Sequence, residues 1–120
     1  MTDRVRFITC QGKSILLVDL SNCRANEVEK ILRTLPDVVT PHPRSSVLAL
    51  TDFTGASLDV EVIRVLKETA AFDKPFVKKS AFVGTENFPP EVSENLSTFS
   101  RRGFPAFKTR EEALAWLAKD

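Results

Sequence analysis

The stretch Ser46–Phe72, SVLALTDFTGASLDVEVIRVLKETAAF, carries the pattern that decides the fold. An apolar run at Val47–Leu50 is followed by the polar turn Thr51–Gly55, and apolar residues at helical spacing begin at about Val60. A strand, a polar turn and a helix in this order form half of a β-α-β unit. In such units, ligands and partners usually meet the fold at the loops that follow the carboxyl ends of the strands.

The composition is that of one globular domain spanning residues 1–120. The hydrophobic fraction of 42% and the charged fraction of 28% are ordinary, and this length can bury a sizeable core. A net charge of +1 gives no support for a nucleic-acid partner. No apolar run is long enough for an integral membrane segment, and the first residues do not form a secretory signal, so we expect a cytoplasmic location.

Strands and helices are predicted to alternate along the chain after an opening hairpin. The first strand is expected to be an edge strand, with Arg4 and Arg6 protecting the edge. The second strand is an almost continuous apolar run, which is typical of burial on both faces. Pro36 is expected to end the first helix, which Asn26 caps. The predicted strands are Arg4–Cys10, Ile15–Leu20, Val47–Leu50, Ser80–Val83 and Phe104–Lys108, and the predicted helices begin near Asn26, Val60, Pro89 and Thr109.

This order of elements predicts an α/β fold with a mixed, mostly parallel five-stranded sheet and four helices. If sequential strands are neighbours, the strand order is 1-2-3-4-5, with the first strand antiparallel. Right-handed crossovers would then place all four helices on one face of the sheet. Because the inner strands are apolar on both faces, the second face needs cover from a helix that crosses over, a dimer partner or an apolar ligand.

The side chains that catalysis requires are missing from the pattern. His42 is the only histidine, and it lies in a Pro-His-Pro loop without the partners that a catalytic triad needs. With 4 glycines, the chain has no Gly-rich phosphate loop. Cys10 and Cys23 lack the ligand spacing of a zinc site and are expected to be reduced thiols. We therefore expect no catalytic residue, no metal site and no cofactor.

Nine phenylalanines and no tyrosine point to a Phe-rich core. Phe53 and Phe88 differ from the others because they lie in loops that follow strands, where a large apolar side chain is less expected. These two residues are candidates for contact with an apolar ligand.

Four segments, taken together, resemble a known family. They are ILLVDLSN at Ile15–Asn22, VLALTDFTGAS at Val47–Ser57, KPFVKKSAFVG at Lys74–Gly84 and FPAFKTREEALAWL at Phe104–Leu117. In order and spacing they resemble the STAS domain of anti-sigma-factor antagonists, in its bacterial STAS/SEC14-like branch. The resemblance covers almost the whole chain, and it implies a β-α superhelix built on a mixed sheet.

In regulatory STAS proteins, a serine in an Asp-Ser-Ser-Gly-type motif at the start of the helix after the third strand is phosphorylated by a partner kinase. The matching region here is ASLDVE at Ala56–Glu61, from which the motif is absent. We expect Asp59 to cap the helix. The alternative is that its carboxylate permanently mimics a phosphate charge.

The sequence therefore predicts a non-enzymatic protein-interaction domain. A protein partner would dock on the rim formed by the loops after the second and third strands and by the start of the second helix. An alternative is the binding of an apolar small molecule or lipid in a Phe-lined pocket or on the second sheet face, and a homodimer would also cover that face. The predicted partner-binding residues are Asp19, Ser21, Asp52, Thr54, Ser57, Asp59 and Glu61.

Overall fold

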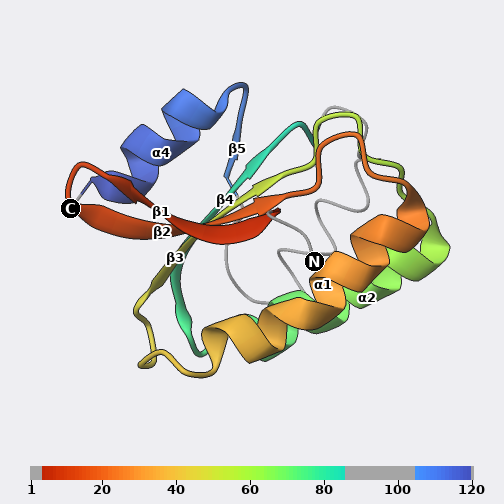
Figure 1. The fold of residues 1–120 in the computed structure, drawn as a ribbon, viewed down its shortest axis with the longest axis horizontal. Coiled ribbons are helices and arrows are strands. Elements are labelled where there is room, and N and C mark those ends of the chain that lie inside the picture. The colour runs from red at the N-terminus through yellow and green to blue at the C-terminus, as the bar shows by residue number, and fades with distance from the viewer. Residues whose placement is uncertain (1–3, 86–104, 120) are drawn as a thin grey trace.

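The computed structural model describes residues 4–85 and 105–119, which form one five-stranded mixed sheet with helices on both faces (Figure 1). The strand order is β1-β2-β3-β4-β5, as predicted. The first pair is antiparallel, and the later pairs are parallel. The strands are β1 (Val5–Cys10), β2 (Lys13–Asp19), β3 (Val47–Asp52), β4 (Val77–Val83) and β5 (Ala106–Phe107).

The described residues contain three helices: α1 (Ala25–Val39), α2 (Val60–Asp73) and α4 (Arg110–Ala118). The helix predicted from Pro89 lies outside the described residues. Among the described helices, none is long and apolar enough to cross a membrane.

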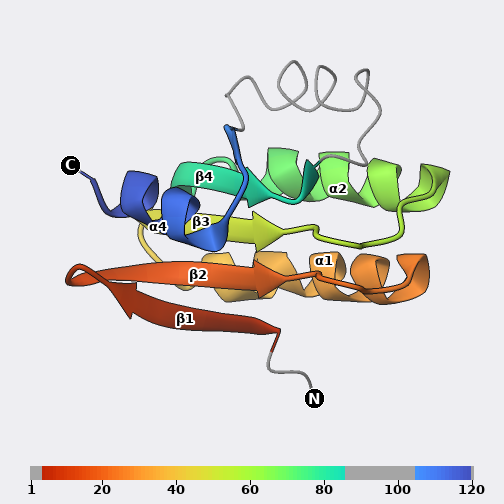
Figure 2. The same cartoon turned by 90° about the horizontal axis from the view of Figure 1, so that it is seen from above.

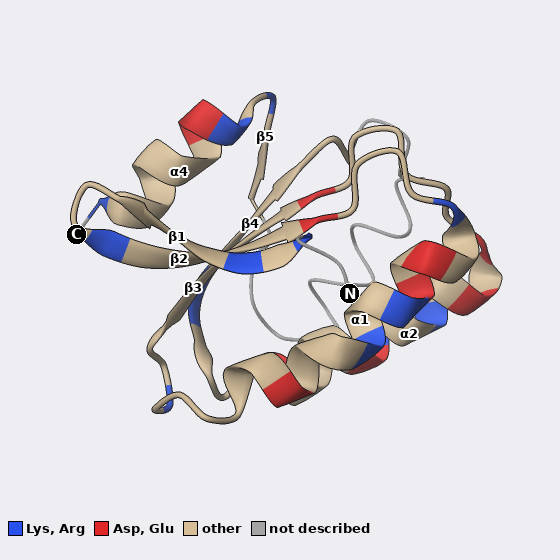
Figure 3. Ribbon diagram, viewed as in Figure 1, with Lys and Arg blue, Asp and Glu red and all other residues tan. Residues whose placement is uncertain are grey.

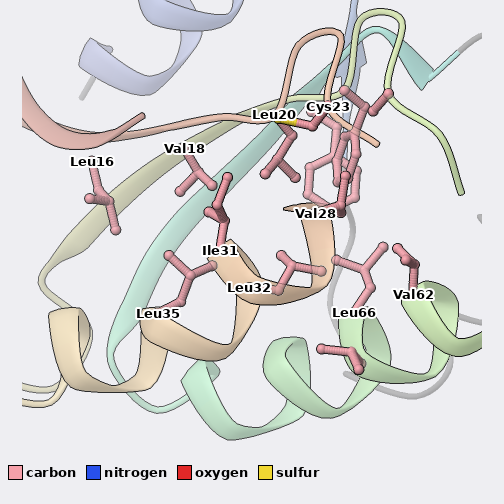
Figure 4. Packing of buried hydrophobic residues seen from close by; sticks show 14 of the residues in the cluster. Leu16, Val18, Leu20, Cys23, Val28, Ile31, Leu32, Leu35, Val62 and Leu66 are labelled. Carbon is pink, nitrogen blue, oxygen red and sulfur yellow. The ribbon is translucent and has the colours of Figure 1, made fainter. Parts of the chain in front are cut away.

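Helices α1 and α2 lie side by side on one face of the sheet (Figures 1 and 2). Side chains from both helices meet the strand side chains that point to this face (Figure 4). Leu32 of α1 and Leu66 of α2 are 1% and 5% exposed, and Leu16 of β2 is 2% exposed. The continuous apolar run of β2 is thus buried on this face and, through Leu17, on the other face as well.

The second face is covered by α4, which corrects the expectation that all helices share one face. Its Ala113 and Leu117 are fully buried against a second apolar cluster that includes Leu17 and Leu50. The crossover rule constrains helices that join two parallel strands. Helix α4 follows the last strand and joins none, so the rule does not place it.

Two predictions about α1 were wrong. The helix begins at Ala25, and the N–H of Arg24 donates to Glu27 Oε1 at 3.0 Å, so the capping pair lies earlier than the predicted Asn26 and Glu29. The helix also continues through Pro36 to Val39. Val39 is 1% exposed, and its burial fixes the last turn against the core although Pro36 lacks a backbone N–H.

Candidate functional site

Two similar turns end β2 and β3. Asp19 and Asp52 are paired in register at the carboxyl ends of these strands. Asp19 Oδ1 accepts the N–H and the hydroxyl of Ser21 at 3.0 and 2.5 Å. Asp52 Oδ1 accepts the N–H and the hydroxyl of Thr54 at 2.9 and 2.6 Å. Each aspartate therefore fixes its own loop by hydrogen bonds to the residue two positions later.

An arginine of α4 joins the two turns. Arg110 Nε donates to Asp52 Oδ2 at 2.7 Å, and Arg110 Nη2 lies 3.1 Å from Asp19 Oδ1. The Asp52 side chain is only 7% exposed, so this pair is shielded from solvent on the aspartate side. A second arginine, Arg4, contacts the turn after β2: its Nη1 donates to the carbonyl oxygens of Asp19 and Ser21 at 3.2 and 3.0 Å. We call Arg4, Asp19, Asp52 and Arg110 the strand-end ion-pair cluster.

The environment of Asp19 favours its charged form. Burial acts to raise the pKa of Asp19, but the hydrogen bonds from Ser21 and the charge and hydrogen bond of Arg110 outweigh it. The pKa of Asp19 therefore lies below its ordinary value, and the carboxylate stays ionised at neutral pH. A carboxylate held in this state is a structural anion and a poor general acid.

The loops after the strands pack closely against one another. The N–H of Leu20 donates to Asp52 O at 2.9 Å, and the N–H of Asn22 donates to Thr54 O at 2.8 Å, so pairing continues beyond the strands. Gly55 has φ +70°, and a Cβ at this position would collide with Asn22 Oδ1. Gly84 has φ +77°, and a Cβ there would collide with the backbone N of Thr54. The predicted rim is therefore a preformed surface among the described loops.

The start of α2 completes this surface. Ser57 lies before the helix and is exposed, and its N–H donates to Cys23 O at 2.9 Å. Asp59 Oδ1 accepts the N–H of Val62 at 2.8 Å, so Asp59 is the N-cap. Val60 occupies the first turn with 85% of its surface exposed. These loops thus combine two exposed hydroxyl-bearing residues, Thr54 and Ser57, with the largely exposed apolar side chain of Val60.

Glu61 belongs to an ion-pair network on the outer surface of α1 and α2, where acidic and basic segments alternate (Figure 3). Arg64 hydrogen-bonds Glu61 and donates to Glu68 at 2.8 Å, and Arg33 lies 3.7 Å from Glu61. The hydrogen bond from Arg64 holds the pKa of Glu61 below its ordinary value. Glu61 is therefore already paired within the chain.

Of the two phenylalanines that the sequence suggested as ligand contacts, the structure describes only Phe53. Phe53 is 1% exposed, and its ring packs edge-to-face on Phe82 with centroids 5.1 Å apart. Phe88 lies outside the described residues. A cavity of about 50 Å³ lies between the sheet and helices α1 and α2, and its described lining includes Phe82 but not Phe53.

The chemistry of metal binding is also missing from the described part of the chain. No group of three His, Cys, Asp or Glu side chains there could hold a metal ion. His42 packs on the ring of Phe7 at a centroid distance of 5.0 Å. Cys23 is buried, and burial raises the pKa of its thiol, which disfavours the reactive thiolate.

Comparison with known proteins identifies the fold. No protein-family model and no curated protein sequence matches the chain. An uncharacterized protein of the DUF3478 family from Shewanella loihica PV-4, described as having a SpoIIAA-like fold, superposes with a TM-score of 0.68 at 17% identity. The match covers 94% of this chain and 91% of that chain. An anti-sigma-factor antagonist (STAS) domain protein from Planctomyces limnophilus superposes with a TM-score of 0.59 at 19% identity over 96% of this chain and 98% of that one. The chain has a STAS-like fold.

Within this STAS-like fold, the structure brings together the residues predicted from the two strand ends. Asp19, Ser21, Asp52 and Thr54 lie in adjacent turns, whereas Glu61 is paired on the helical side. Sequence reasoning missed the roles of Arg4 and Arg110. The repeated Asp-x-Ser/Thr pattern at the two strand ends was a signal for paired turns, but nothing local indicated that an arginine 58 residues from Asp52 would join them.

Proposed function

We propose that this chain is a non-enzymatic protein-interaction domain that docks a protein partner on its strand-end rim. The rim comprises the loops after β2 and β3 and the first turn of α2. The observation that carries the proposal is Val60, which is 85% exposed and follows a helix cap fixed by Asp59. Burying a valine side chain at an interface contributes about 1.5–3 kcal/mol. A partner with an apolar pocket flanked by hydrogen-bonding groups fits this surface.

The predicted residues divide into two roles in this proposal. Thr54, Ser57 and Val60 are exposed and would contact the partner. The carboxylates of Asp19 and Asp52 act by positioning, since both are engaged by hydrogen bonds and by Arg110. Ser21, Asp59 and Glu61 are likewise engaged within the chain and would shape or border the docking surface.

Two features support a binding role over catalysis. The carboxylates of the strand-end ion-pair cluster are paired with Arg110 and lack a neighbouring nucleophile–base pair among the described residues. The loops are held by backbone hydrogen bonds and close glycine contacts, so the surface is preorganised. Preorganisation lowers the entropy lost on association.

The small-molecule alternative has weaker support. A more open pocket of about 270 Å³ lies on the outer side of α1 and α2, but its described lining includes the charged Arg33 and Glu68 beside Phe72, which does not suit an apolar ligand. The cavity between the sheet and helices α1 and α2 has a volume of about 50 Å³. An apolar cavity that accommodates benzene measures about 150 Å³, so this space suits one or two waters better than a lipid chain. Its lining also includes buried hydroxyl groups from Thr51 and Ser80.

Site-specific photo-crosslinking in cells of the source organism tests the docking surface. A photo-reactive amino acid at position 57 or 60 is expected to capture the same protein, whereas one at Ala115, exposed on α4, is not. With that protein purified, Val60→Asp is expected to weaken binding at least tenfold, which corresponds to about 1.4 kcal/mol. Ala115→Asp serves as the control and should leave the affinity unchanged. Equal capture from position 115, or unaltered affinity of Val60→Asp, would contradict the proposal.

A further inference from the structure

Among the described residues, the outer edge of β1 is the longest strand edge that has no partner strand. Among the described strands, β1 pairs with β2 alone, and the opposite edge is the two-residue strand β5. Strand β1 has six residues and contains neither proline nor glycine. Figure 2 shows it as the outermost described element on its side of the sheet. Such an edge can pair with another strand, and natural proteins usually block this with charges, prolines or bulges.

The register of the hairpin determines which backbone groups point outward. The N–H of Asp19 donates to Arg4 O at 2.7 Å, so Arg4 faces β2 through its backbone. In an antiparallel pair, alternate residues direct their N–H and C=O groups to opposite edges. With the observed pairing, the residues whose backbone groups point away from β2 are therefore Val5, Phe7 and Thr9.

The charges that were expected to protect this edge are only partly in place. Arg4 turns toward the end of β2, where it hydrogen-bonds the carbonyl oxygens of Asp19 and Ser21. Arg6 is exposed on the strand. Beside it, Phe7 is 41% exposed and is supported by the ring of His42. The edge thus presents an aromatic side chain at its centre.

We propose that β1 pairs antiparallel with β1 of a second copy of this chain, with the two-fold axis at Phe7. In this register, Phe7 faces its own counterpart, and Val5 of each copy faces Thr9 of the other. All three outward-pointing residues then form pairs that exchange both backbone hydrogen bonds. The two sheets become one continuous sheet, closed by two-fold symmetry.

Charge placement and the length of the strand select this register over its neighbours. An axis at Arg6 sets two arginines directly opposite each other, which is destabilising. An axis at Ile8 leaves the outward groups of Val5 without a partner strand. With the axis at Phe7, Arg6 of each copy lies opposite Ile8 of the other, and the two Phe7 rings adjoin on the face that carries α1 and α2. Such an aromatic pair contributes to cross-strand stability.

Disulfide trapping tests the register. A cysteine at position 7, introduced as Phe7→Cys in a Cys10→Ser background, would face its own counterpart with a Cα separation of about 5.5 Å. This separation suits a disulfide. We expect Phe7→Cys to form a covalent dimer under mild oxidation, detected by non-reducing electrophoresis and intact mass. Thr9→Cys in the same background is the matched control and should form little covalent dimer, because Thr9 faces Val5 of the other copy and not its own counterpart.

Sedimentation equilibrium of the purified chain tests the interface itself. We expect reversible dimerisation that Phe7→Lys abolishes and that Thr9→Pro weakens at least tenfold. Thr9→Pro removes an N–H that points away from β2, so the hairpin itself should tolerate it. Phe72→Lys, which changes an exposed phenylalanine on α2, is the control and should dimerise normally.

A chain that stays monomeric at its highest soluble concentration would overturn the proposal and leave the edge to a strand from a different protein. A dimer that persists in both Phe7→Lys and Thr9→Pro would also overturn it, because another surface would then form the dimer. The strand-end rim takes no part in these measurements, so their outcome is independent of the proposed docking function.

Discussion

Helices α1 and α2 cover one face of the sheet, whereas the short helix α4 alone covers the other among the described residues. On the first face, two helices of 15 and 14 residues contribute long apolar stripes to the larger cluster. On the second face, a helix of 9 residues contributes three buried side chains, Ala113, Leu117 and Ala118. Burial of apolar side chains therefore stabilises the packing of α1 and α2 on the first face. Helix α4 buries fewer apolar side chains on the second face.

Polar contacts at both ends of α4 compensate for its small apolar area. At the N-terminal end, Arg110 pairs with Asp19 and Asp52. At the C-terminal end, Lys79 Nζ donates to the carbonyl oxygens of Trp116 and Lys119 at 3.3 and 2.6 Å and lies 5.0 Å from the Trp116 ring centroid. A terminal helix with few buried side chains is thus positioned by charged residues of the strands it covers.

Truncating one buried leucine on each face tests this difference most strongly. Leu32 and Leu117 are 1% and 0% exposed, and leucine-to-alanine changes at such positions cost about 2–5 kcal/mol of unfolding free energy. We expect Leu32→Ala to lower the stability of the whole sheet, because α1 belongs to the main core. We expect Leu117→Ala to increase opening of α4 first, while α1 keeps most of its protection.

Hydrogen exchange measured by mass spectrometry separates the two results. The expected pattern is faster exchange at residues 110–118 in Leu117→Ala, with little change at residues 25–39. Uniform acceleration across the chain in both variants would show that the two faces unfold as one cooperative unit.

Removing the Arg110 side-chain charge is expected to have the next largest effect. Arg110→Gln leaves the nearly buried carboxylate of Asp52 without its cation, and hydrogen bonds to charged groups contribute about 1.5–3 kcal/mol. Urea unfolding should show this loss, together with faster exchange in the loops that follow β2 and β3. Lys79→Gln is the matched control at the other end of α4, where exposed contacts of this kind contribute about 0.5–1 kcal/mol. Equal losses of unfolding free energy in the two variants would mean that the Arg110–Asp52 pair contributes no more to stability than the contacts of Lys79.

The elements with strong local signals were predictable from the sequence. The apolar run of β2 and the cap of α2 at Asp59 each depend on a few neighbouring residues. The strand order also followed, because short connections between alternating strands and helices leave few topologies.

Features that depend on tertiary contacts were not predictable in the same way. Pro36 carries a local stop signal, but burial of Val39 on the far side of it keeps α1 helical. The position of α4 depends on which sheet face remains apolar and uncovered. The pairing of Arg110 with Asp52 joins residues 58 positions apart, so neither residue type nor spacing could indicate it. The turns after β2 and β3 were therefore predictable as polar loops. Their pairing with Arg110 of α4 was not predictable.

Acid unfolding tests the smallest expected effect, the contribution of Asp19. The pKa of Asp19 is lowered in the folded chain, and an unperturbed aspartate titrates near about 3.9. The unfolded chain therefore binds the proton more tightly, so the stabilisation is fully present above the unfolded pKa and is lost as the pH falls through the folded pKa. Asp19→Asn should cost on the order of 1 kcal/mol of unfolding free energy at pH 7.

Urea unfolding at a series of pH values should show the gap in unfolding free energy between wild type and Asp19→Asn closing below about pH 4. Asp37→Asn, at an exposed position of α1, provides the reference for removing one carboxylate. A gap that stays constant down to the acid limit would mean that the carboxylate charge of Asp19 does not stabilise the rim, and that its hydrogen-bond geometry alone positions the loop.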